Sequence, residues 1–122
     1  MAYTNLTVLD SDKDGDELIA LMVAANTQGT SGFECDNDGK VILIVLDQLA
    51  AGAGDTLTLE GNPDKFGRDE AALARTITAK KIYSIGPFMP EMYNQTGGKL
   101  RFAFTTAAAT TSLIAIRVAN PK

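Results

Sequence analysis

The first side chains that could do chemistry in this chain are alternating carboxylates near the N-terminus. Asp10, Asp12 and Asp14 are followed by Gly15, a pattern typical of the start of an EF-hand calcium loop, where alternate carboxylates converge on one hard cation. The twelfth loop position must supply a bidentate carboxylate, but here it is Leu21, and a strand pattern precedes the loop instead of a helix. We therefore predict a solvated acidic turn and no cofactor. A calcium site at the three aspartates is the less favoured alternative.

Catalytic residue sets are difficult to assemble from this sequence. The chain has no histidine, the side chain most often used as a general base near neutral pH. Ser31, Ser84 and Thr105 therefore lack the partner that a Ser-His-Asp triad requires. The glycines at positions 52 and 54 are not followed by the later glycine and lysine of a phosphate-binding loop, and they precede a strand pattern. We predict that the protein is not an enzyme.

Further carboxylates and the single thiol have structural interpretations. A glycosidase needs two paired carboxylates, and the candidates are Asp55, Glu60, Asp64, Asp69, Glu70 and Glu91. Most of them lie in segments rich in lysine and arginine, which favours a solvated surface. Cys35 has no second cysteine with which to form a disulfide or a thiolate-rich zinc site. We expect a free, buried thiol.

Charge and hydropathy limit the partners. The chain has 15 acidic and 11 basic residues, giving a net charge of -4, the wrong sign for tracking a phosphate backbone. Its longest apolar run, residues 41–46, is far too short to span a bilayer, and the first residues lack the features of a signal peptide. We predict synthesis in the cytosol, with neither nucleic acid nor membrane as a partner.

Alternation of polar and apolar residues with a period of two predicts strands along most of the chain. The predicted strands are residues 4–9, 41–46, 56–60, 75–79, 81–85, 99–104 and 112–118. Residues 41–46 are apolar on both faces, which predicts a central strand covered from both sides. Residues 75–79 and 81–85 could be one bent strand, and the last two strands are expected to pair. Seven or eight short strands at roughly ten-residue spacing indicate an all-β fold, a β-sandwich or jelly-roll-like barrel forming a single domain over residues 1–122.

Two segments between these strands have less regular patterns. In residues 17–26, apolar residues recur at helical spacing, which predicts either one short amphipathic helix or an apolar extended segment. Residues 27–39 contain three glycines and the turn pair Asp38-Gly39, so we expect a loop. Phe33 and Cys35 are its expected anchors in the core.

Residues 85–94 form a connector in which two prolines and a glycine exclude a regular element, although four large apolar side chains are present. Those side chains are Phe88, Met89, Met92 and Tyr93. They either plug the open end of the sandwich, which we favour for Phe88 and Tyr93, or form an apolar contact patch. Methionine and aromatic residues are enriched in interface cores, so all four are candidate interface residues.

The block Gly86-Pro87-Phe88-Met89-Pro90-Glu91-Met92-Tyr93-Asn94 resembles the Gly-Pro-Phe-x-Pro-x-x-Tyr-Asn block of small virion proteins of tailed bacteriophages that are encoded beside the major capsid protein. The likeness continues, in order, over residues 1–8, 23–26, 37–40 and 115–118, with Phe33 between the second and third of these blocks. It covers most of the chain. The sequence departs from the resemblance in the acidic loop of residues 10–16 and in the charged loop of residues 61–70.

The resemblance implies a capsid decoration or cement protein, which binds the outside of the phage head and stabilises it by bridging capsomers. It implies the major capsid protein as partner, a virion location on the capsid exterior, and a homo-oligomer. A trimer is favoured because capsid proteins of this class often sit at threefold positions. The alternatives are a calcium-stabilised adhesion module and a carbohydrate- or receptor-binding β-sandwich of a virion or cell surface. Sugar-binding platforms use exposed aromatic rings, and the chain has three tyrosines and no tryptophan.

Overall fold

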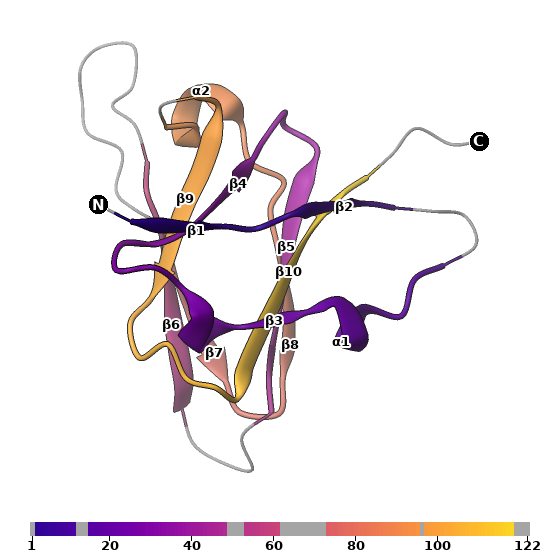
Figure 1. Ribbon diagram of the computed structural model, residues 1–122, viewed down its shortest axis with the longest axis vertical. Helices are drawn as coiled ribbons and strands as arrows, with labels where there is room; N and C mark the ends of the chain where they lie inside the picture. Colours follow the sequence, from indigo (N-terminus) through magenta and orange to yellow (C-terminus); the bar gives the residue numbers. More distant parts are fainter. Residues whose placement is uncertain (1, 12–14, 49–52, 62–72, 96, 119–122) are drawn as a thin grey trace.

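Two packed β-sheets make up most of the protein. The computed structural model describes residues 2–11, 15–48, 53–61, 73–95 and 97–118, shown in colour in Figure 1. These residues form ten strands in two five-stranded sheets. The prediction of an all-β sandwich is confirmed, whereas the two sheets do not close into a barrel.

The two sheets, here called sheet A and sheet B, each draw strands from the whole length of the chain. Sheet A has the order β1 (Tyr3–Asn5), β4 (Gly32–Asp36), β9 (Lys99–Phe104), β6 (Ala53–Leu59) and β7 (Leu73–Thr78). Sheet B has the order β2 (Val8–Asp10), β10 (Thr111–Arg117), β5 (Val41–Asp47) and β8 (Ile82–Ile85), and β3 (Val23–Ala24) also pairs with β10.

The core lies between the sheets and is built around aromatic side chains of sheet A. Phe33 stacks on Phe102 with ring centroids 5.7 Å apart and meets Phe104 edge-on at 6.3 Å. Phe33 and Cys35 are fully buried, as predicted for the anchors of their segment. The loop prediction for residues 27–39 is nevertheless wrong for Gly32–Asp36, which form β4, whereas residues 37–39 are a turn as predicted. The alternating apolar positions of β4 were hidden by the turn residues on both sides.

The N-terminal segment crosses from one sheet to the other. The single strand predicted for residues 4–9 is divided: β1 pairs in parallel with β4, and β2 pairs in parallel with β10. Leu6, between them, is buried, and its N–H donates to the carbonyl of Glu34 over 2.7 Å. The segment therefore closes one edge of the sandwich, as Figure 1 shows.

Strand β5 confirms only part of its prediction. It is central, because it lies between β10 and β8. Its burial alternates, however: Val41, Leu43 and Val45 are fully buried, whereas Ile42, Ile44 and Leu46 are half-buried on the outside of sheet B. The prediction that β5 is covered on both faces is wrong, because one of its faces lies outside the sandwich.

Two pairs of strands that were expected to be continuous or paired lie in different sheets. β7 and β8 are two strands and not one bent strand, and the residues between them include Lys80 with a positive φ of 58°. β9 and β10 also lie in different sheets, so the predicted pairing of the last two strands is wrong. Such connections pass between the layers of the sandwich, and no local pattern marks them.

Short helical turns complete the described structure. Residues 17–26 contain both predicted forms, because α1 (Leu18–Leu21) is followed by β3 and then by the 3-10 turn η1 (Ala25–Thr27). The expectation that residues 85–94 contain no regular element is wrong for Pro90–Tyr93, which form α2 with proline at its first position. Two α-helical turns therefore exist where at most one was predicted. Proline is tolerated at the first position of α2 because the first N–H of a helix has no intrahelical partner.

Candidate functional site

The connector of residues 85–94 is held against the turn between β4 and β5 by two asparagines. The Asn37 amide nitrogen donates to Asn94 Oδ1 over 2.7 Å and lies 3.2 Å from the Phe88 carbonyl. The Asn94 amide nitrogen donates in return to the Asn37 carbonyl over 3.0 Å. Asn37 is 7% exposed, so these bonds replace water that its amide has lost. We call this arrangement the asparagine clamp.

Two glycines allow the backbone to follow this path. Gly39 has a φ of +91°, and its N–H donates to Asn37 Oδ1 over 3.1 Å, which makes an Asx-type turn. Gly86 has a φ of +118°, and a Cβ added there would lie 2.9 Å from the Phe88 ring and 3.1 Å from the Val41 carbonyl. Only glycine fits position 86 without moving neighbouring atoms.

The aromatic residues of the connector belong to the core. Phe88 is 3% exposed, and Tyr93 packs against the buried cluster and meets Phe88 edge-on at 5.6 Å. Both rings therefore pack in the way predicted for residues that plug the open end of the sandwich. Phe88 is not available as a contact residue, because its side chain is enclosed by its own sandwich.

The methionines of the connector differ from the rings and from each other. Met89 is 57% exposed, whereas Met92 is half-buried. Met89 and the neighbouring prolines surround a shallow apolar hollow, lined by Gly39, Pro87, Phe88, Met89 and Pro90. Among the four candidate interface residues, Met89 offers the largest exposed apolar surface, and it does so on a backbone fixed by the asparagine clamp.

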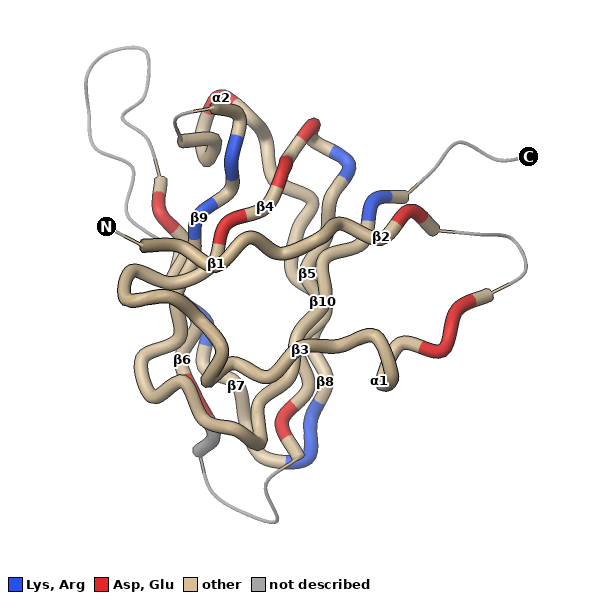
Figure 2. Tube along the Cα trace, viewed as in Figure 1, with Lys and Arg blue, Asp and Glu red and all other residues tan. Residues whose placement is uncertain are grey.

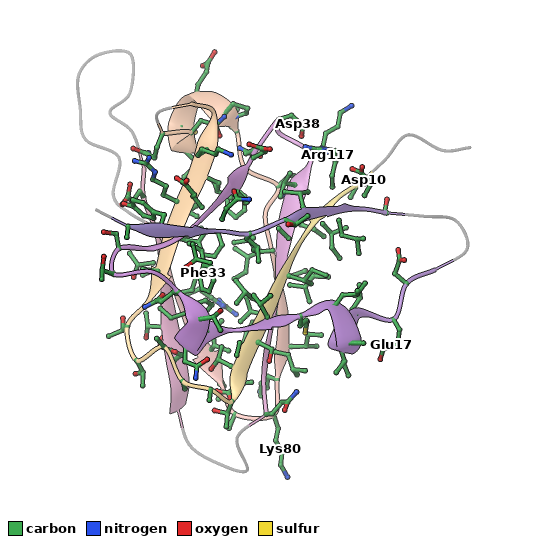
Figure 3. The ribbon with its side chains drawn as sticks, in the orientation of Figure 1. Asp10, Glu17, Phe33, Asp38, Lys80 and Arg117 are labelled. Carbon is green, nitrogen blue, oxygen red and sulfur yellow. The ribbon has the colours of Figure 1, made fainter. Side chains whose placement is uncertain are left out.

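A charged cluster lies beside the same turn. Arg117 Nη1 donates to Asp10 Oδ1 over 3.0 Å, and Arg117 Nε lies 3.0 Å from Asp38 Oδ2, an ion-pair contact without hydrogen-bond alignment. Figure 3 shows the three side chains gathered at one end of the molecule. The Lys40 N–H and the Arg117 guanidinium lower the pKa of Asp38 below its usual value. The cluster joins β2, the β4–β5 turn and β10.

Of the three aspartates considered as calcium ligands, Asp10 alone lies in the described part of the chain. Asp12 and Asp14 lie outside the described residues, and Asp10 is paired with Arg117. Leu21, at the twelfth loop position, ends α1 and is 49% exposed. In the part of the chain that the structure describes, no three acidic or cysteine side chains gather in a way that could hold a metal ion.

Asp55 and Glu60, two of the other carboxylates named in the sequence analysis, have structural partners. Asp55 is 4% exposed, and its carboxylate accepts the N–H groups of Thr56, Thr106 and Ala108 over 2.8 to 3.2 Å. It therefore fixes the turn between β9 and β10. Glu60 accepts the hydroxyl of Tyr3 over 2.8 Å. Asp64, Asp69 and Glu70 lie outside the described residues.

The thiol of Cys35 has an environment that suppresses its reactivity. The residue is fully buried, and burial raises the pKa of the Cys35 thiol to about 12. Because the thiolate is the nucleophile and the metal ligand, this side chain stays protonated and inert near neutral pH. It packs between the sheets as a small apolar group.

The asparagine clamp itself was missed by reasoning from the sequence. Asn37 was interpreted as part of a turn, and Asn94 as the end of a motif, but the two amides are 57 positions apart. The available signal was that both residues fall in blocks that carry the phage resemblance. Those blocks, with residues 115–118, are adjacent in space, because Val118 N–H also donates to the Lys40 carbonyl over 3.0 Å.

Comparison with known proteins adds no relative. No protein-family model matches the chain, and no curated protein or solved structure matches it either. Within the described residues, no helix has the length and apolar character needed to cross a membrane.

Proposed function

We propose that this protein is a non-catalytic virion component that binds the outside of a bacteriophage capsid as a decoration protein. The observation that carries the proposal is the asparagine clamp. It joins two blocks of the phage resemblance, residues 37–40 and 86–94, and presents the exposed Met89 on a fixed backbone. The major capsid protein is the proposed partner.

A fixed loop is well suited to adhesion. Ordering a flexible loop on binding costs free energy, and a loop already held by hydrogen bonds avoids most of that cost. Methionine adapts its unbranched side chain to irregular apolar surfaces and is enriched in interface cores. The hollow that Met89 lines also includes Gly39, the neighbour of Asp38 in the sequence, so the β4–β5 turn connects the apolar hollow to the charged cluster.

The carbohydrate-binding alternative gains no support from the tyrosines. Arg101 covers the Tyr3 ring at 4.5 Å, and Arg75 covers the Tyr83 ring at 4.8 Å. Tyr93 packs against Phe88. A sugar that stacks on an aromatic platform needs an open ring face, and each of these three rings already has a partner.

Co-sedimentation with capsids tests the proposal. Purified protein is mixed with undecorated phage heads, the heads are pelleted, and the bound fraction is measured across micromolar concentrations. We expect saturable binding that Met89→Ser weakens at least tenfold, with an unchanged melting temperature because Met89 is exposed. Leu73→Ser, which changes an exposed apolar residue on β7, is the matched control and keeps its binding. Absence of saturable binding by the unaltered protein would exclude the decoration role.

A further inference from the structure

The outer face of sheet B carries an unbroken set of aliphatic side chains. In the register, Ile114 lies opposite Ile44, Ile116 lies opposite Ile42, and Leu46 lies opposite Ile82. Strand alternation places seven aliphatic residues on this side: Leu9, Ile42, Ile44, Leu46, Ile82, Ile114 and Ile116. Ile114 and Ile116 are both buried, although neither belongs to the core cluster between the sheets.

The other side chains on this face are small or neutral. Alternation adds Ala24, Ser84 and Ser112, which lie opposite Ser112, Ile44 and Leu46. The described strands of sheet B therefore place no charged side chain in the middle of this face. Ile82 is 62% exposed. Single exposed aliphatic residues are common on protein surfaces, but a contiguous set across four strands is a feature of interaction surfaces.

The short helix α1 extends this apolar surface. None of its residues is buried, and Ile19 and Leu21 are 62% and 49% exposed. Leu21 shares an apolar hollow of about 390 Å³ with Leu9 and Ile114, two residues of the sheet B face. Figure 1 shows α1 beyond β3, on the side of sheet B that faces away from sheet A.

We propose that the sheet B face, with α1, is the surface through which two copies of this chain associate around a twofold axis. Each chain has a net charge of -4, so two copies repel each other over most of their surfaces. A neutral face lets them approach without bringing like charges together or burying an unpaired charge. Identical flat faces match each other in an isologous contact, as stacked sheets do at about 10 Å. The inference is independent of the proposed capsid role.

The size of the face sets the expected strength. β5 and β10 have seven residues each, and four strands side by side give a face of roughly 23 by 19 Å, or about 400 Å² per copy. A standard interface buries about 800 Å² per partner, and weak complexes bury less than about 600 Å². With the addition of α1, the sheet B face falls in the weak class. We therefore expect a reversible dimer with a micromolar dissociation constant.

Analytical ultracentrifugation of the whole chain between about 1 and 500 µM tests the proposal. We expect a monomer–dimer equilibrium whose dissociation constant rises at least tenfold in Ile82→Lys, because the twofold axis brings the new charges onto a face without counter-charges. Because Ile82 is exposed, the melting temperature of the Ile82→Lys variant should equal that of the unaltered protein. Thr76→Lys, an exposed site on the outer side of the other edge strand β7, is the matched control and leaves association unaltered.

A labelling experiment gives a second measurement that does not depend on a charge. Ser84→Cys places a thiol on the sheet B face, while Cys35 is buried and unreactive. Maleimide labelling of the introduced thiol is expected to slow as protein concentration rises, and a Thr76→Cys control labels at a constant rate. The proposal would be overturned if the protein is a monomer at 500 µM. It would also be overturned if Ile82→Lys leaves the dissociation constant unchanged and the Ser84→Cys thiol labels at the same rate at every protein concentration. A mass of three chains would contradict the twofold arrangement and support the trimer implied by the phage resemblance.

Discussion

The outer faces of the two sheets differ although both sheets pack on the same core. On sheet A, Glu34 pairs with Arg101 at 3.1 Å, and Asp36 pairs with Lys99 at 2.7 Å, in both cases across β4 and β9. Sheet B has aliphatic residues in the corresponding places. Figure 2 shows charged positions along β4 and β9, and none through the middle of β5 and β10. The alternation of residues along a strand therefore specifies which side chains face the core. The charge and polarity of the side chains on the outer face indicate whether that face is suited to contact with water or with protein.

The largest expected effect on stability comes from comparing a core-facing and an outward-facing residue of the same strand. Phe102 and Arg101 are neighbours on β9, the first facing the core and the second facing outward. Phe102→Ala should lower the free energy of unfolding by about 3–5 kcal/mol through lost burial and a cavity. Arg101→Ala should cost about 1 kcal/mol or less, because partly exposed ion pairs contribute little. Urea denaturation measures both, and equal losses would mean that the outer pairs of sheet A matter as much as its core.

A second prediction concerns the asparagine clamp, which closes one end of the sandwich. Asn37→Ala leaves Asn94 Oδ1 and the Phe88 carbonyl without the donor that Asn37 supplies, so we expect a loss of about 1–3 kcal/mol in the free energy of unfolding. Asn94→Ala should cost a similar amount. If the two amides act together, the double variant loses less than the sum of the single losses. Additive losses in denaturant titrations would show that each asparagine acts separately.

A third prediction separates the two methionines of the connector. Met92 is half-buried and Met89 is exposed, so Met92→Ser should lower the free energy of unfolding by about 1 kcal/mol or more, and Met89→Ser by less than about 0.5 kcal/mol. Thermal unfolding of the isolated protein measures the difference. The reverse order would place Met89 in the core and remove it from the proposed contact surface.

The smallest expected effect is a dependence on pH at the charged cluster. The pKa of Asp38 is lowered in the folded protein by the Lys40 N–H and by Arg117, so ionised Asp38 stabilises the fold at neutral pH. That contribution is complete above the ordinary value of 3.8 and is lost as the pH falls through the lowered value. The urea midpoints of the unaltered protein and Asp38→Asn should therefore converge once the pH lies below the lowered pKa of Asp38. A gap that persists there would assign the effect to packing.

Local patterns predicted much of the fold. Alternation located most of the strands, and apolar residues in a turn-rich segment identified Phe33 and Cys35 as core residues. The same patterns could not assign strands to sheets, because pairing depends on contacts far apart in sequence. β9 and β10 have similar alternation and lie in opposite sheets. Residues 41–46 suggested two covered faces because their outer residues are aliphatic, although the second cover is not supplied by the described part of the chain.

The candidate site was predictable only in part, for a related reason. The connector was recognisable in the sequence because large apolar residues lie among prolines, and this pattern located Met89. The hydrogen bonds that fix the connector come from Asn37, in a different turn. A side chain that acts at long range leaves no periodic signal, so its role appears only when the fold brings it to its partner.

The crossing of the N-terminal segment has a consequence for synthesis on the ribosome. β2 pairs with residues 115–117 of β10, and the Ser11 N–H donates to the Arg117 carbonyl over 2.9 Å. β2 is therefore synthesised long before the strand with which it pairs. Pairings of such sequence separation form slowly, because closing a long loop costs entropy before any contact compensates for it. β2 therefore lacks its partner until β10 has been synthesised, so sheet B can form completely only after β10 has emerged.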